Sequence, residues 1–120
     1  MRLAVDVMGG DHGPEELLQG VKLGLAADPS ISRLYVVGPP SVLEPLLRST
    51  GCSDPRLAIH PASEVLTMED KPVQGLRKKK DCSILRAVEL VRDGKADAVI
   101  SSGNTGGIVA AATIRLRTLE

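Results

Sequence analysis

The sequence has neither phenylalanine nor tryptophan, and Tyr35 is its one aromatic residue. Aromatic side chains that stack on bases are therefore almost missing, which argues against a platform for single-stranded nucleic acid. The formal net charge is zero, so the strongly basic composition of most nucleic-acid-binding proteins is absent as well. The core must be aliphatic, which suits buried strands packed between helices.

Cysteines and long apolar runs are also scarce. Cys52 and Cys82 lie far apart and outside any C-x-x-C motif, so they indicate neither a disulfide framework nor a zinc site. No apolar run approaches the roughly 18 residues of a membrane span, and Asp6 interrupts the first apolar run too early for a signal peptide. We therefore expect a soluble protein of the reducing cytosol.

Short apolar runs alternate with segments of helical periodicity, the pattern of one α/β domain with a parallel sheet and helices on its faces. The predicted strands are Leu3–Met8, Leu34–Gly38, Leu57–His60 and Ala98–Ser101. The predicted helices are Glu15–Ala27, Pro40–Ser49, Ser83–Asp93 and a fourth that begins near Thr105. The expected apolar face of the first helix carries Leu18, Val21 and Leu25, and that of the second carries Val42, Leu46 and Leu47. The third helix is expected to bury Ile84, Ala87, Val88 and Val91. The last helix has no stop signal before Glu120, so we expect the chain to be part of a longer one.

Ligands of parallel sheets bind at the carboxyl ends of the strands. The turns expected at that edge are 8–13, 38–40, 60–63 and 101–107. The long connection 63–81 precedes the last predicted strand, and long connections of this kind are often functional or mobile. We therefore look for the site among these segments.

The segment 101–107, Ser-Ser-Gly-Asn-Thr-Gly-Gly, leads from a strand through a glycine-rich turn into a helix. Free N–H groups and the helix dipole at such a turn bind anions, and Ser102, Asn104 and Thr105 add side-chain donors. The segment matches neither a Walker A loop nor G-x-G-x-x-G. An ordinary N-cap by Asn104, with glycines for tight packing, explains the same residues, and both interpretations stay open.

Another glycine-rich turn follows the first strand, where Gly9 and Gly10 allow the backbone to approach a ligand closely. Asp11 and His12 come next, where an acid–base or orienting pair would be useful. One histidine in a turn does not by itself indicate catalysis, so helix capping by Asp11 and a solvated His12 is the favoured alternative.

Acidic residues dominate residues 1–70, whereas basic residues dominate 71–120. The densest cations lie just before the third predicted helix, and they are Arg77, Lys78, Lys79 and Lys80. They suit an anionic substrate or an acidic partner protein. The alternative interpretation is that these residues form a solvated charge run, balanced by nearby acidic residues.

Two further chemistries are not favoured. Cys82 lies beside lysines and a helix start, but no histidine is near in sequence, so a structural role is the better interpretation. Asp11, His12 and His60 lack any recognised metal-ligand spacing, so no metal site is expected.

Three segments together, 5–14, 68–80 and 101–106, strongly resemble the bacterial phosphate acyltransferase (PlsX) family in order and spacing. The resemblance runs from residue 1 to about residue 117, and it makes residues 1–120 the N-terminal part of a single α/β phosphate acyltransferase domain. Cys82, Ser102 and Gly107 depart from the commoner family residues, each by a change of one small residue for another.

The resemblance implies a three-layer α/β/α sandwich with a Rossmann-like, mostly parallel sheet, similar to isocitrate and isopropylmalate dehydrogenases and here incomplete. It implies acyl transfer from acyl carrier protein to inorganic phosphate, giving acyl phosphate for phospholipid synthesis, without a cofactor. It also implies a cytoplasmic, peripherally membrane-associated homodimer, functionally linked to a membrane glycerol-3-phosphate acyltransferase.

For such a reaction, Asp11, His12 and Asn104 are the candidate catalytic residues. The candidate phosphate-binding residues are Gly9, Gly10, Ser102, Gly103, Asn104, Thr105 and Gly106. The candidate contacts to carrier protein or anion are Arg77, Lys78, Lys79 and Lys80. The alternatives are phosphotransacetylase-like transfer from acyl-CoA, a non-catalytic phosphate-binding fragment, and a stretch that is stable only when paired with another chain.

Overall fold

The computed structural model describes residues 1–8, 14–51, 54–64, 71, 74–75, 78–79 and 81–101. Its elements are β1 (Arg2–Asp6), α1 (Pro14–Ala27), β2 (Arg33–Gly38), α2 (Pro40–Thr50), β3 (Leu57–Pro61), α4 (Ser83–Arg92) and β4 (Ala98–Ser101). The four strands form one sheet in the order β3-β2-β1-β4, and every pair is parallel. The predicted parallel α/β architecture is therefore confirmed.

The predicted strands and the first three predicted helices are confirmed, with differences only at their ends. Met8, for example, lies beyond the end of β1. The helix expected near Thr105 lies outside the described residues. None of the helices in the described ranges has the length and apolar character needed to cross a membrane.

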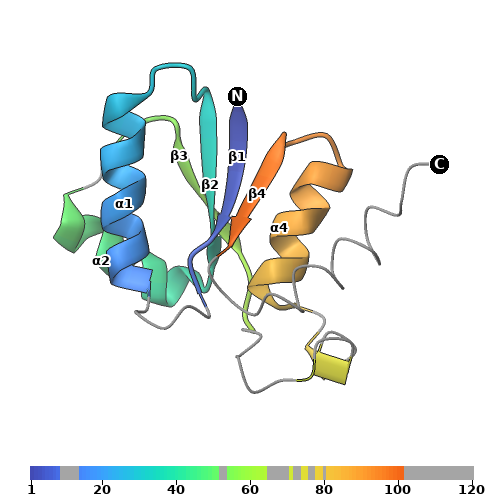
Figure 1. The fold of residues 1–120 in the computed structure, drawn as a ribbon. Helices are drawn as coiled ribbons and strands as arrows, with labels where there is room; N and C mark the ends of the chain where they lie inside the picture. Colours follow the sequence, from blue (N-terminus) through green and yellow to red (C-terminus); the bar gives the residue numbers. More distant parts are fainter. Residues whose placement is uncertain are drawn as a thin grey trace.

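The sheet lies between two helical layers. Figure 1 shows α1 and α2 on one side of the strands and α4 on the other. Side chains alternate along a strand, so β1 directs Val5 to the α1 face and Ala4 to the α4 face, where each joins a different buried cluster. This layering confirms the expected α/β sandwich.

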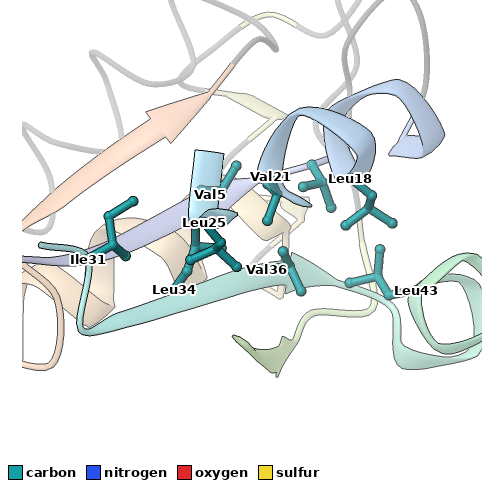
Figure 2. Close-up of a cluster of buried hydrophobic side chains, with 9 residues drawn as sticks. Val5, Leu18, Val21, Leu25, Ile31, Leu34, Val36 and Leu43 are labelled. Carbon is teal, nitrogen blue, oxygen red and sulfur yellow. The ribbon is translucent and has the colours of Figure 1, made fainter. Parts of the chain in front are cut away.

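The core on the α1 face is aliphatic, as the composition predicts (Figure 2). Its buried members are Val5, Val7, Leu18, Val21, Leu25, Ile31, Leu34, Val36 and Leu43. The three residues predicted for the buried face of α1 are all among them. For α2 the prediction of Val42 is wrong, because Val42 is 38% exposed and Leu43 is buried. Leu43 shares a helical face with Leu46 and Leu47 at i, i+3 and i+4, whereas Val42 is turned away from the sheet.

The core on the α4 face is built from small side chains under a broad helix surface. Ile84, Ala87 and Val88 are buried as predicted, and Val91 is half-buried. The helix also buries Ser83, Leu85 and Leu90, so its buried face is wider than the predicted stripe. Alanines at 4, 62, 87 and 96 allow α4 to approach the sheet closely.

An apolar groove of about 280 Å³ runs between α1 and β4. Gly20 and Gly24 line it from α1, and a methyl group added at either glycine would have no atom within 4 Å. Ile100 lines it from β4 and is 52% exposed. The groove therefore lies on the α1 face of the sheet and not on the α4 face.

Two glycine substitutions are expected to change stability in opposite directions. Gly24→Ala places a methyl group in open space inside a helix and should stabilise the chain by about 0.5–1 kcal/mol, because alanine loses less conformational freedom on folding. Gly94→Ala should destabilise it by about 1 kcal/mol, because φ is +76° at the end of α4. Urea unfolding of the 120-residue variants tests both, and equal shifts of the same sign would contradict the described backbone.

Candidate functional site

The carboxyl ends of all four strands lie side by side at one edge of the sheet. Asp6 at the end of β1 pairs in register with Val37 of β2 and with Ser101 of β4. Gly38 at the end of β2 pairs with Pro61 of β3. The turns predicted for ligand binding therefore begin at this edge, as far as the structure describes them.

Gly38 keeps the middle of this edge compact. A Cβ atom at this position would come within 2.9 Å of the Met8 Cγ and 3.2 Å of the Leu43 Cδ1. The carbonyl oxygen of Gly38 accepts a hydrogen bond from the Ala62 N–H at 3.1 Å. The absence of a side chain at Gly38 thus allows Met8, which follows β1, to cross the end of β2.

Asp6 is the buried carboxylate of this edge, with 4% of its surface exposed. Its Oδ1 accepts the Met8 N–H at 3.1 Å and its Oδ2 accepts the Ser101 hydroxyl at 3.2 Å. Burial raises the pKa of Asp6, and the nearby Ser83 hydroxyl partly offsets the rise. The Ser83 hydroxyl is itself buried and makes no hydrogen bond of normal geometry within the described part of the chain.

Sequence reasoning assigned no site role to Asp6 or Ser83. A signal for Asp6 was present, because a charged residue at the end of a strand buried on both faces is unusual and often functional. For Ser83 there was no comparable signal, because serine at a helix start is ordinarily a cap.

Most of the predicted site residues lie outside the described residues. These are Gly9, Gly10, Asp11, His12, Arg77, Lys80, Ser102, Gly103, Asn104, Thr105 and Gly106. Lys78 is described and exposed, and Lys79 is half-buried. The Cys82 N–H donates to the Lys79 carbonyl oxygen at 3.2 Å, which places this part of the basic run next to the start of α4.

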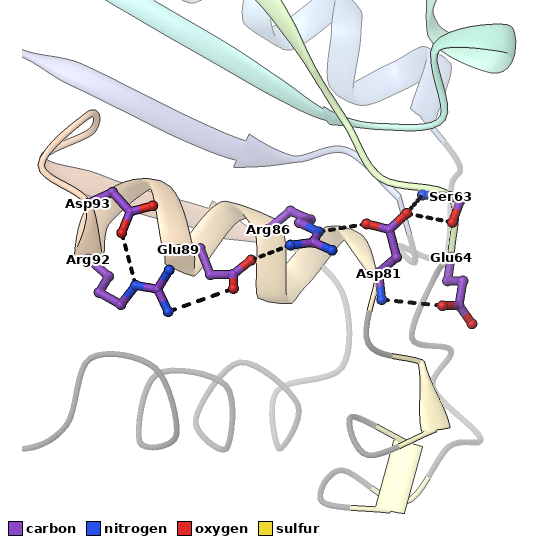
Figure 3. A network of polar contacts seen from close by, with 7 residues as sticks. All are labelled: Ser63, Glu64, Asp81, Arg86, Glu89, Arg92 and Asp93. Carbon is purple, nitrogen blue, oxygen red and sulfur yellow. Dashed lines mark hydrogen bonds and ion pairs between the residues drawn. The ribbon is translucent and has the colours of Figure 1, made fainter.

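The two ends of the long connection are tied together beside α4 (Figure 3). The Asp81 carboxylate accepts the Ser63 N–H at 3.0 Å, the Ser63 hydroxyl at 2.6 Å and the Arg86 Nε–H at 2.6 Å. The Ser63 hydroxyl and then Arg86 lower the pKa of Asp81 to about 2. Glu64 accepts the Asp81 N–H at 3.2 Å. Residues 63 and 64, which follow β3, are therefore joined to Asp81, which precedes α4.

A chain of charges on α4 orients Arg86 toward that point. Arg86 Nη1 lies 2.9 Å from one carboxylate oxygen of Glu89, and Arg92 Nη1 lies 3.8 Å from the other (Figure 3). Ion pairs exposed to this degree contribute little individually to stability. Their effect here is to fix the direction of the Arg86 side chain.

Cys82 and His60 do not have the environment of reactive groups. Cys82 is completely buried, and burial raises the pKa of its thiol, which disfavours the nucleophilic thiolate. Burial, followed by Lys95 and Arg86, lowers the pKa of His60. In the described ranges no three His, Cys, Asp or Glu side chains gather as metal ligands would. The rejection of Cys82 as a nucleophile is consistent with this burial.

The described strand ends bring the starting points of two predicted anion-binding segments together. The glycine-rich segments after β1 and β4 start from neighbouring points, because Asp6 and Ser101 are paired. Backbone N–H groups from two adjacent turns can surround a tetrahedral anion without a metal.

Comparison with known proteins shows one consistent similarity. Residues 1–120 match the family described as fatty acid synthesis protein. The chain is 48% identical over 112 residues to a phosphate acyltransferase of Exiguobacterium sp., covering 92% of this chain and 33% of that protein. It is 48% identical over 118 residues to a phosphate acyltransferase of Pseudomonas fluorescens, and the match covers 98% of this chain and 35% of that protein. For a phosphate acyltransferase of Akkermansia muciniphila the identity is 44% over 120 residues, covering 100% and 34%. The chain thus spans about a third of the length of the curated relatives it matches.

Proposed function

Because this chain belongs to the fatty acid synthesis protein family, we propose that it carries the phosphate-binding part of an acyltransferase. The proposed reaction transfers a fatty acyl group from acyl carrier protein to inorganic phosphate and yields acyl phosphate for phospholipid synthesis. The names of the relatives support acyl transfer to phosphate.

The observation that carries the proposal is the pairing of Asp6 with Ser101 at the carboxyl edge. Because of this pairing, the glycine-rich segments 9–13 and 102–107 follow strand ends that are adjacent in the sheet. In our proposal the residues from Gly103 to Gly106 hold the phosphate, with Ser102 beside them, and Gly9 and Gly10 form the opposite wall. Positioning of this kind supplies much of the catalysis when the nucleophile is already reactive.

Phosphate is such a nucleophile, because it carries negative charge near neutral pH. One of its oxygens attacks the thioester carbonyl, the C–O bond forms, and the C–S bond breaks to release the carrier thiolate. Asn104 would stabilise the charge that develops. His12, oriented by Asp11, would supply the proton that the thiolate takes up. The burial of Cys82 supports direct attack rather than an acyl-enzyme on that residue.

The proposed partners follow from charge. Lys78 and Lys79, with Arg77 and Lys80, provide a basic segment for an acidic carrier protein or for the phosphate of its prosthetic arm.

We further propose a cytoplasmic homodimer that works at the membrane surface and delivers its product to a membrane glycerol-3-phosphate acyltransferase.

The direct test follows thioester cleavage by the full-length protein with and without inorganic phosphate. We expect cleavage to require phosphate and to produce acyl phosphate with acyl-carrier-protein donors. A preference for acyl-CoA would instead show a phosphotransacetylase-like enzyme. Stabilisation by phosphate without any acyl phosphate would show a binding module and contradict the proposal.

A further inference from the structure

Asp6 is a buried carboxylate that has no cationic partner among the described residues. Its side chain is 4% exposed, and it forms no ion pair with any residue that the structure describes. Burying a charge without a partner lowers stability. Proteins keep such groups mainly where function requires them. The contacts of Asp6 indicate which part of the molecule it acts on.

The two oxygens of the Asp6 carboxylate bind different strand ends. Oδ1 accepts the N–H of Met8, which follows β1, at 3.1 Å, and Oδ2 accepts the hydroxyl of Ser101, the last residue of β4, at 3.2 Å. Met8 precedes Gly9 in the sequence, and Ser101 precedes Ser102. One side chain therefore joins the two points from which the glycine-rich segments leave the sheet.

The surroundings of Asp6 hold the carboxylate in that place. It lies on the α4 face beside Ser83, the first residue of α4, whose hydroxyl is 1% exposed and lowers the pKa of Asp6. The positive end of a helix dipole favours a carboxylate at its N-terminus. The position of the Asp6 side chain is thus fixed by groups at the end of β1, at the end of β4 and at the start of α4.

We propose that Asp6 is a positioning residue, whose carboxylate sets the spacing between the ends of β1 and β4 and thereby orients both phosphate-binding turns. The inference rests on the proposed function for the identity of the ligand. The two hydrogen bonds that carry it do not depend on that function. Both Asp6 oxygens already accept hydrogen bonds from the strand ends, so Asp6 acts through those ends and not on the phosphate itself.

Two substitutions of Asp6 separate positioning from a general structural role. In the full-length protein Asp6→Ala removes both hydrogen bonds and should raise the phosphate KM about 10-fold or more, with the acyl-donor KM unchanged. Asp6→Asn should recover most of that loss, because its amide oxygen can accept the Met8 N–H and its NH₂ can donate to the Ser101 oxygen. Ser101→Ala removes the hydroxyl that donates to the Asp6 Oδ2 and should raise the phosphate KM by a smaller factor.

Outcomes that overturn the inference are distinct from those that overturn the function. If both Asp6 variants weaken phosphate and acyl donor in parallel, or if asparagine gives no rescue, Asp6 is merely structural. Amide hydrogen exchange of Met8 should accelerate in Asp6→Ala, which loses the acceptor of that N–H. If the alanine variant does not fold, Ser101→Ala, which keeps that acceptor, must still raise the phosphate KM with the acyl-donor KM unchanged. Unchanged exchange overturns the inference whatever the activity. A wild-type protein that neither binds nor consumes phosphate overturns the proposed function and leaves the exchange result to decide the role of Asp6.

Discussion

Leu18→Ala is expected to lower the free energy of unfolding of the chain by about 3 kcal/mol. Leu18 is completely buried and belongs to the cluster that joins α1 to the sheet, beside Val5 and Val36 (Figure 2). Truncation to alanine removes buried apolar contacts and leaves a cavity that rigid strands cannot close. Urea unfolding followed by circular dichroism measures the loss as a lower midpoint with an unchanged slope.

Leu23→Ala on the same helix provides the matched control. Leu23 is 70% exposed, so the same chemical change should alter the unfolding free energy by less than about 0.5 kcal/mol. The two variants change helix propensity equally, and the difference between them therefore reports burial. Similar losses in both would mean that α1 does not pack on the sheet through Leu18.

The fold could be predicted from the sequence where the pattern is local. The alternation of apolar runs with helical periodicity located all described strands and the described long helices. Leu18, Val21 and Leu25 were predicted because a stripe spaced i, i+3 and i+7 is visible along the helix itself. Glycine is the usual residue just beyond a helix end, and Gly94 has a φ of +76° shortly after the end of α4. Local rules suffice for features of this kind.

Contacts between distant residues could not be predicted in the same way. Arg56 donates hydrogen bonds to the carbonyl oxygens of Leu25, Asp28 and Ile31 and so fastens the end of α1 beside β3. It also lowers the pKa of Asp54 to about 2 through a paired hydrogen bond. No periodic pattern links these positions, because the contact depends on how α1 and β3 pack in three dimensions.

In the candidate site, too, some features could be predicted from the sequence and others could not. Its location at the carboxyl edge was predictable, since parallel strands must end together. The partnership of Asp6 with Ser101 was not, because it depends on the register between β1 and β4. The roles of His12 and Asn104 remain predictions from motif and family, since both residues lie outside the described part of the chain.

Asn104→Ala is expected to reduce kcat/KM for phosphate about 100-fold in the full-length protein. Asn104 is three residues beyond Ser101, in the glycine-rich segment that begins beside the end of β1. Its amide can donate a hydrogen bond to the negative charge that develops during acyl transfer, and alanine has no donor to replace it. Steady-state kinetics with varied phosphate measure the change, and an unaltered phosphate KM and kcat would contradict the assignment.

Asn104→Asp distinguishes this role from that of a helix cap. Aspartate caps a helix about as well as asparagine, so a residue that only caps would tolerate the change with its activity intact. A phosphate-binding residue would not, because aspartate removes the donor and places a negative charge against the anion. We therefore expect Asn104→Asp to lose more activity than Asn104→Ala while unfolding at a similar urea concentration. Activity retained in the aspartate variant would assign Asn104 to the helix and leave phosphate to the backbone N–H groups alone.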